Sequence, residues 1–214
     1  RLRVEEETYL SGVRVYPMGN SLDICVETDA LTAGEASLTL TSDALADAVA
    51  RRVDVKPGVG ELWFRGLPLA ENVRRWDEED GNLYTLTATL GGSTRTVRFG
   101  VRDFRAEGGV LTLNGRRIFL RSEANCAVFP EEGHPPMTVE RWREVLAVYR
   151  SYGVNCMRFH SHIPPEAAFA AADEMGNCTG KLGPSACGSL GYAFPDAMYA
   201  RNVVVITDNL VPYP

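Results

Sequence analysis

Hydrophobic and polar residues alternate with a period of two along the first half of the chain, from Thr8 to about Arg105. This period is typical of strands that bury one face, because successive side chains of a strand point to opposite sides. Turn residues such as Pro57-Gly58 and Gly91-Gly92 separate the segments. About seven short strands with turns every roughly 8–12 residues predict an antiparallel, immunoglobulin-like β-sandwich over residues 8–106.

The pattern changes after residue 106. Asn114-Gly115 suits a type I′ turn and predicts a hairpin between residues 110–113 and 116–121. Thr138 is suited to cap a helix, and the apolar residues after it recur at helical spacing as far as Tyr149. This helix is expected to end at Gly153.

A second strand and a second helix follow. Residues 154–159 are expected to form the strand, and Pro164-Pro165-Glu166 begins a helix that ends at Gly176. Alternating strands and helices are typical of parallel α/β structure, such as a doubly wound sheet or an eight-stranded barrel. Two such units complete neither fold. The expected fold class is therefore mainly β: a sandwich followed by the first β/α units of an incomplete barrel.

Residues 177–214 have a different composition. They carry 4 charged residues in 38, against 46 in the preceding 176. Within them, only Val203–Ile206 has the pattern of a strand. We interpret this segment as a poorly specified tail.

Composition excludes several classes of protein. The net charge of −6, without a basic block, argues against nucleic-acid binding. The chain has no apolar run of the roughly 18 residues that a membrane helix needs, so no membrane partner is expected. Five cysteines without a C-x-x-C pair are read as free thiols, which favours the cytoplasm over the periplasm or the cell exterior. The first residues, Arg-Leu-Arg, lack both an initiator Met and a signal peptide, which suggests that the natural start lies upstream.

Six blocks of the sequence stand in a characteristic order: Asn82–Leu86, Arg98–Arg102, Leu113–Arg121, Tyr152–Arg158, Pro164–Phe169 and Asp173–Gly176. In this order they resemble glycoside hydrolase family 2, which holds β-galactosidases, β-glucuronidases and β-mannosidases. The resemblance covers roughly residues 8–176.

The resemblance implies an architecture and an activity. The family has a sugar-binding jelly-roll domain, an immunoglobulin-like sandwich and a (β/α)₈ barrel that hydrolyses glycosides with retention, using two glutamates. Residues 1–7 would end the first of these domains, residues 8–106 would form the sandwich, and residues 107–176 would begin the barrel. The two glutamates follow later barrel strands, so no catalytic residue is assigned and the chain is expected to be inactive. The alternative is a non-catalytic sandwich that spaces other domains or binds a partner.

Barrel enzymes place their working residues at the carboxyl ends of strands. The resemblance implies that Arg158 lies under the sugar and orients the carboxylates. The block Ser161–Pro164 resembles a Ser-His-Tyr-Pro block whose histidine contacts substrate. Because one extra residue separates it from Arg158, either His160 or His162 takes that role. The candidate residues for binding a carbohydrate substrate are Asn125, Arg158, His160 and His162, beside the strand-end residues Glu123 and Cys126.

His160 and His162 permit one alternative, a metal-dependent hydrolase, since a strand places residues i and i+2 on one face. Such a site needs more ligands from later strands, and the chain has 3 histidines, none of them after His162. We therefore expect neither a metal nor a cofactor. The three tryptophans, Trp63, Trp76 and Trp142, are expected to fill cores or a domain junction.

The resemblance ends at Gly176, where the family continues with an apolar third strand. Asn177-Cys178-Thr179-Gly180 follows here instead. We interpret the break as the result of a shifted reading frame or an aberrant fragment.

Overall fold

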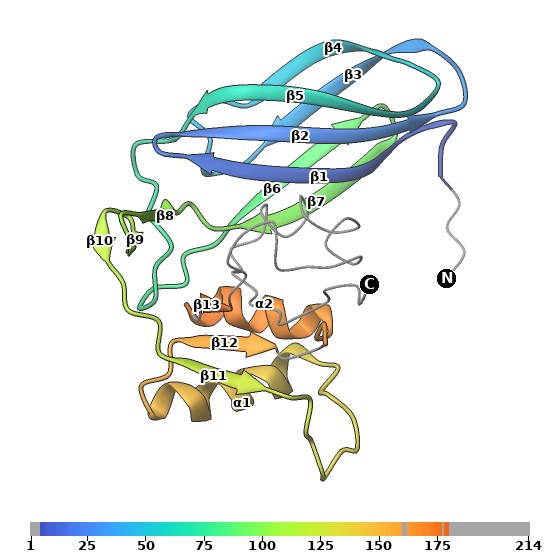
Figure 1. Cartoon of the computed structure of the whole chain (residues 1–214). Helices are drawn as coiled ribbons and strands as arrows, with labels where there is room; N and C mark the ends of the chain where they lie inside the picture. Colours follow the sequence, from blue (N-terminus) through green and yellow to red (C-terminus); the bar gives the residue numbers. More distant parts are fainter. Residues whose placement is uncertain (1–4, 160–161, 177, 180–214) are drawn as a thin grey trace, which may run out of the picture. The chain divides into compact units, whose positions relative to one another are not determined.

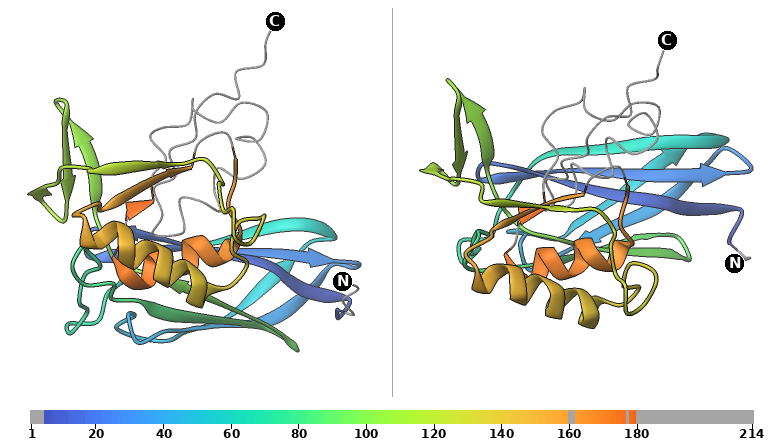
Figure 2. Two further views of the ribbon diagram at one scale, coloured as in Figure 1. Left: turned by 90° about the horizontal axis from the view of Figure 1, so that it is seen from below. Right: turned by 60° about the horizontal axis from the view of Figure 1, so that its bottom comes forward.

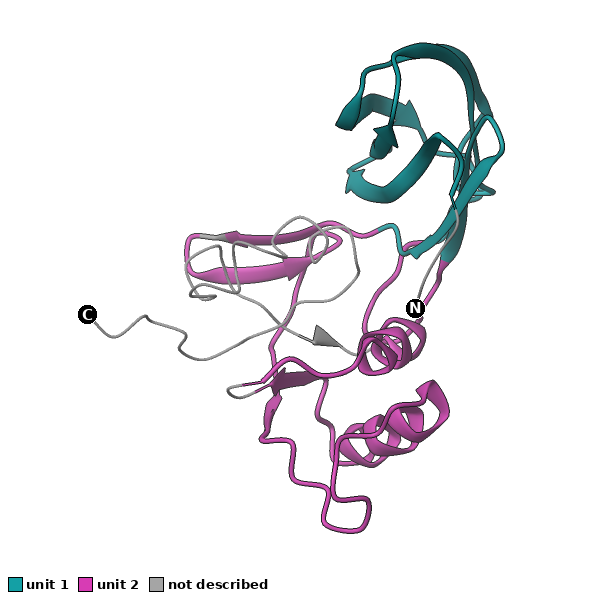
Figure 3. Cartoon of the chain, turned by 90° about the vertical axis from the view of Figure 1, so that its right-hand side faces the viewer, with its two compact units in different colours: residues 1–74, 84–101 teal, residues 75–83, 102–214 magenta. Residues whose placement is uncertain are grey.

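The computed structural model describes residues 5–159, 162–176 and 178–179. It forms two compact units, residues 1–74 with 84–101 and residues 75–83 with 102–214 (Figure 3). The first unit contains strands β1 (Thr8–Met18), β2 (Ser21–Ala30), β3 (Gly34–Thr41), β4 (Val49–Val55), β5 (Gly58–Pro68), β6 (Tyr84–Leu90) and β7 (Ser93–Phe99). The second contains β8 (Phe104–Glu107), β9 (Val110–Leu113), β10 (Arg116–Arg117), β11 (Ser122–Asn125), α1 (Val139–Ser151), β12 (Cys156–Phe159), α2 (Glu166–Met175) and β13 (Cys178–Thr179).

The first unit is an antiparallel sandwich, as its alternating sequence predicts (Figure 1). One sheet has the strand order β1-β2-β5 and the other β4-β3-β6-β7. Inward-facing residues of both sheets form a single core, because every second residue of each strand is apolar. The core includes Leu10, Ile24, Leu38, Leu86 and Phe99, each at most 1% exposed.

The outer face of β1-β2-β5 carries polar and aromatic side chains. Gly12 lies opposite Glu27 in the β1–β2 register, where a Cβ would come within 2.0 Å of the Glu27 carboxylate. Trp63, expected to be in a core, is on this outer face and 39% exposed, stacked on Tyr16 at 5.6 Å. Trp63 is exposed because it falls on the polar phase of β5, whereas its neighbour Phe64 points into the core.

The predicted hairpin forms, and β8 adds a third strand to it that the sequence did not suggest. Asn114 and Gly115 both have positive φ, 52° and 77°, as a type I′ turn requires. The last strand of the hairpin is only two residues long because Ile118 turns into a core.

Strands β11, β12 and β13 form a parallel sheet, and both helices lie on one side of β11 and β12 (Figure 2). Thr138 caps α1 as predicted, accepting the N–H of Arg141 at 3.3 Å. Gly176 ends α2 in the left-handed conformation, with φ 68°. The short strand β13 was not expected; its backbone pairs with the free edge of β12 at Cys156 and Met157.

Two cores lie on the two faces of this sheet. Met157 and Phe159 point toward the helices and pack with Trp142, Leu146 and Ala168. On the other face Cys156 packs with Trp76, Leu113 and Ile118. None of the described helices is long and apolar enough to cross a membrane.

Candidate functional site

The carboxyl ends of β11 and β12 lie side by side because the two strands are parallel. Residues paired in register share a face of the sheet. Ala124 pairs with Arg158, and Ser122 pairs with Cys156. Since Cys156 belongs to the core on the face away from the helices, Arg158 stands on that face too, half-buried.

Asn125 takes the opposite face, because it pairs with Phe159, which packs on the helices. It is 6% exposed. Its side-chain oxygen accepts the N–H of Ala127 at 3.1 Å, and Ala127 has a left-handed φ of 57°. The Asn125 side chain also hydrogen-bonds the Tyr149 hydroxyl of α1. Asn125 therefore fixes the loop that leaves β11.

The hydroxyl of Tyr149 is sensitive to this environment. Burial raises its pKa, and the negative charge of Glu123 adds to the effect, while the hydrogen bond with Asn125 opposes it. Glu123 itself is exposed on β11. Cys126, the next candidate along the chain, is an exposed free thiol.

His162 is half-buried and follows β12. Its ring meets the ring of Phe159 edge-on, with centroids 5.6 Å apart. Phe159 in turn contacts Trp142 and Phe169 in the same manner, so His162 joins an aromatic cluster on the helix side. His160 lies outside the described residues.

The described part of the chain shows no group of three or more His, Cys, Asp or Glu residues placed to hold a metal ion.

A second polar cluster, not singled out by the sequence, lies on the outer face of the sandwich. The guanidinium of Arg14, 8% exposed, contacts Cys25 Sγ at 3.3 Å, Glu27 at 3.0 Å and Glu61 at 2.5 Å. The Trp63 indole donates to Glu61 at 3.0 Å. The sequence shows which residues of β1, β2 and β5 point outward. Which of them come together can be predicted only once the register of the three strands is known.

The groups of this cluster shift one another's pKa values. Burial disfavours the charged form of Arg14, but hydrogen bonds with Cys25 and Glu61 hold its pKa above the ordinary value. The hydrogen bonds from Trp63 and Arg14 lower the pKa of Glu61, and burial raises the pKa of the Cys25 thiol. A buried cation paired with carboxylates is a structural feature of the sheet.

Comparison with known proteins finds relatives for most of the chain. It is 27% identical over 193 residues to a beta-galactosidase of Arthrobacter sp. (strain B7), an alignment that covers 82% of this chain and 18% of that protein. Most of the chain is similar to proteins of glycoside hydrolase family 2. The fold agrees: the crystal structure of a family 2 beta-galacturonidase from Eisenbergiella tayi bound to galacturonate matches with a TM-score of 0.71 and 21% identity, over 81% of this chain and 32% of that one.

The end of the chain matches a different family. Residues 166–214 match the family model "Citrate lyase, alpha subunit (CitF)". The citrate lyase alpha chain of Escherichia coli (strain K12) is 52% identical over 44 residues, which cover 21% of this chain and 9% of that protein. The family 2 resemblance and the citrate lyase match meet in α2. The chain thus spans less than a fifth of the length of either curated relative.

Proposed function

We propose that residues 8–176 are the sandwich and the first two β/α units of a retaining family 2 glycosidase, whose substrate is a carbohydrate. One observation supports this most directly. Arg158 stands near the carboxyl end of β12, on the face away from α1 and α2. In a closed barrel that face is the interior, where a guanidinium can hydrogen-bond sugar hydroxyls and orient carboxylates.

The other candidates take different roles in this proposal. Asn125 positions the loop after β11, because its side chain is engaged by Ala127 and Tyr149. His162 packs on the aromatic cluster around Phe159 and lies at the edge of the proposed site. Either His162 or His160 contacts the substrate.

For the 214 residues themselves we propose no hydrolytic activity. Glycoside cleavage needs two carboxyl groups roughly 5 to 9.5 Å apart across the scissile bond. The resemblance places both glutamates after later barrel strands, and Glu123 of β11 lies on the helix-facing side of the sheet. By itself, the chain would act as a non-catalytic sandwich that spaces other domains or binds a partner.

Two assays test these proposals. The purified chain should release no nitrophenol from aryl β-galactoside, β-glucuronide or β-mannoside above the rate of a blank. Hydrolysis that is lost in Arg158→Ala would contradict the proposed inactivity.

The role of Arg158 needs a complete barrel. Residues 8–176 would replace the corresponding segment of the Arthrobacter beta-galactosidase, and kcat/KM would be measured on an aryl β-galactoside. Arg158→Ala should lower kcat/KM about 100-fold, the scale of a misplaced reacting group. Arg143→Ala is the matched control, since Arg143 lies on α1 and pairs with Glu140 and Glu174. Equal rates for both variants would refute the assignment.

We propose in addition that the chain joins segments of two unrelated families within or just after α2. The match of 52% identity over 44 residues favours this over a shifted reading frame, because an out-of-frame translation does not resemble a known protein. Long-read sequencing of the gene and mass spectrometry of the peptide spanning Met175 and Lys181 test the junction. A gene that continues with family 2 sequence after Gly176 would contradict it.

A further inference from the structure

Residues 75–83, hereafter the 75–83 segment, connect β5 to β6 of the sandwich but belong to the second compact unit (Figure 3). The segment holds Trp76 followed by four acidic residues, Asp77 to Asp80. A run of acids between two strands is ordinarily a solvated loop. Here the side chains of Trp76, Asp77 and Glu78 all have partners.

Trp76 anchors the segment. It is 1% exposed and packs with Leu113, Ile118 and Cys156. Its indole N–H donates to the carbonyl of Asp173 in α2 at 2.7 Å. Its own carbonyl accepts from the Asn114 amide at 3.0 Å. Because the ring is buried and both the indole N–H and the backbone carbonyl of Trp76 are hydrogen-bonded, this residue attaches the segment firmly to the second unit.

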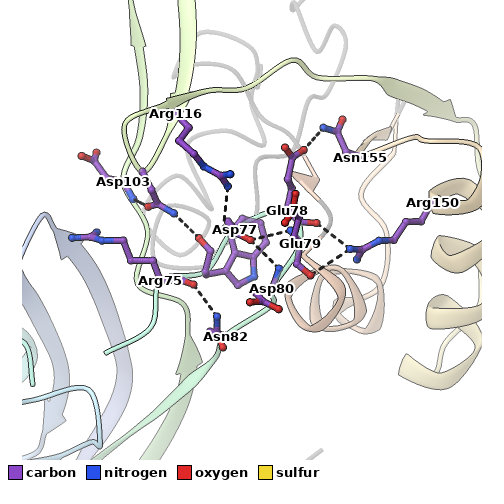
Figure 4. A network of polar contacts seen from close by, with 12 residues as sticks. Arg75, Asp77, Glu78, Glu79, Asp80, Asn82, Asp103, Arg116, Arg150 and Asn155 are labelled. Carbon is purple, nitrogen blue, oxygen red and sulfur yellow. Dashed lines mark hydrogen bonds and ion pairs between the residues drawn. The ribbon is translucent and has the colours of Figure 1, made fainter. Parts of the chain in front are cut away.

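The acidic residues form a shaped turn (Figure 4). One oxygen of Asp77 accepts the backbone N–H groups of Glu79 and Asp80 at 2.9 and 2.8 Å, and the other pairs with Arg116 at 3.3 Å. Because this carboxylate closes the turn, the next residue, Glu78, is presented to the β/α layer.

Glu78 is connected to the starts of β11 and β12 through Asn155. The Asn155 amide donates to Glu78 at 2.6 Å and to the carbonyl of Phe119 at 3.1 Å, and its oxygen accepts the N–H of Arg121 at 2.8 Å. Arg121 immediately precedes β11 and Asn155 immediately precedes β12. The Glu78 carboxylate therefore holds the residue that ties these strand starts together.

The ends of both helices meet the same segment. Arg150, in the last turn of α1, donates to the carbonyls of Glu78 and Glu79 (Figure 4). It also donates to the carbonyl of Met175 at the end of α2. Backbones also approach closely. A Cβ on Gly81 would lie 2.2 Å from the carbonyl oxygen of Glu174.

We propose that the 75–83 segment is a clamp on the N-terminal rim of the β/α layer, and that this layer holds its native arrangement only while the segment is docked. The rim consists of Arg121 and Asn155 before the strands and Arg150 and Met175 near the helix ends. The segment supplies hydrogen-bond partners to the Asn155 amide, the Arg150 guanidinium and the Asp173 carbonyl. It does so at the end of β12 opposite to Arg158, so it leaves the proposed sugar-facing edge open. The inference is independent of the proposed activity.

Hydrogen exchange of the full chain, read by mass spectrometry, tests the clamp. Gly81→Ala removes no contact and adds one methyl group against the backbone of α2. The methyl group should push the segment away from α2 and thereby break one or two of its hydrogen bonds. The amides of β11, β12 and α1 should then exchange at least about tenfold faster. The amides of β2, β3 and β6 should be unchanged. Gly34→Ala is the matched control, since a Cβ there meets no atom within 4 Å.

Asn155→Ala and Glu78→Gln, singly and together, give the second measurement, should Gly81→Ala fail to fold. Each should accelerate exchange in the β/α layer. The double variant should exchange little faster than Asn155→Ala alone, because both substitutions disrupt the same hydrogen bond between Asn155 and Glu78. Unchanged exchange in β11, β12 and α1, or an equal acceleration in the sandwich strands, would overturn the proposal.

Discussion

Arg14 Nη2 lies 2.5 Å from Glu61 Oε1 across the outer face of the sheet formed by β1, β2 and β5. The two residues are 47 positions apart in sequence, on β1 and β5. Between them lies Cys25 of β2, a side chain small enough to leave room for the guanidinium. This contact makes Arg14 a cross-link of three strands.

Replacing this arginine should destabilise the sandwich. Arg14→Met leaves the partly buried carboxylates of Glu27 and Glu61 without their cation, and we expect a loss of about 1–3 kcal/mol in the free energy of unfolding. Arg52→Met is the control, because Arg52 and its partner Glu35 are both exposed, and it should cost less than about 1 kcal/mol. Urea unfolding followed by circular dichroism measures both; equal losses would show that the Arg14 contacts add no stability.

The same cluster predicts a pH dependence. Hydrogen bonds from Trp63 and Arg14 lower the pKa of Glu61 in the folded state. A carboxyl with a lowered folded pKa binds fewer protons in the folded than in the unfolded chain, so it stabilises the fold above its unfolded pKa of about 4.3. That stabilisation should be lost progressively as the pH falls below about 4.3. Thermal unfolding of the wild type and of Glu61→Gln between pH 7 and pH 3 measures it, and the variant should show the smaller decline.

Three cysteines, Cys25, Cys126 and Cys156, should differ in reactivity. Cys126 is exposed, whereas Cys25 and Cys156 are buried, and burial raises the pKa of both buried thiols. Iodoacetamide reacts with thiolates, so at pH 8 we expect Cys126 to be labelled at least about 100-fold faster than the other two. Peptide mass spectrometry over a time course gives the three rates. Labelling in urea is the control, where these rates should converge; rapid labelling of Cys25 in the folded chain would contradict the buried position.

Ala127 should be a site where glycine stabilises. Its φ of 57° places it in the left-handed region, which costs an L-residue about 1–2 kcal/mol, whereas glycine in the unfolded chain costs about 0.5–1 kcal/mol. The balance favours Ala127→Gly by roughly 0.5 kcal/mol. Ala124→Gly, within β11, should instead destabilise by about 0.5–1 kcal/mol. Hydrogen exchange of β11 amides distinguishes the two, and a destabilising Ala127→Gly would refute the strain.

Local sequence determines much of this protein. The alternation from Thr8 onward specifies the sandwich strands, because the side-chain period of a strand is two and only one phase is apolar. Asn114-Gly115 determines its turn and Thr138 its helix start, since these residues satisfy or relax the backbone within a few positions. The ordered blocks between Asn82 and Gly176 were sufficient to indicate the family.

Only the tertiary structure decided which face each strand-end residue takes. Asn125 and Arg158 both follow the rule for barrel strand ends, yet the register places Asn125 toward the helices and Arg158 away from them. The acidic residues after Trp76 likewise match any solvated loop, and their partners Arg116, Arg150 and Asn155 lie 39 to 77 positions away from the residues they bind. Pairings over such distances depend on where packing brings the backbone, which no local pattern encodes.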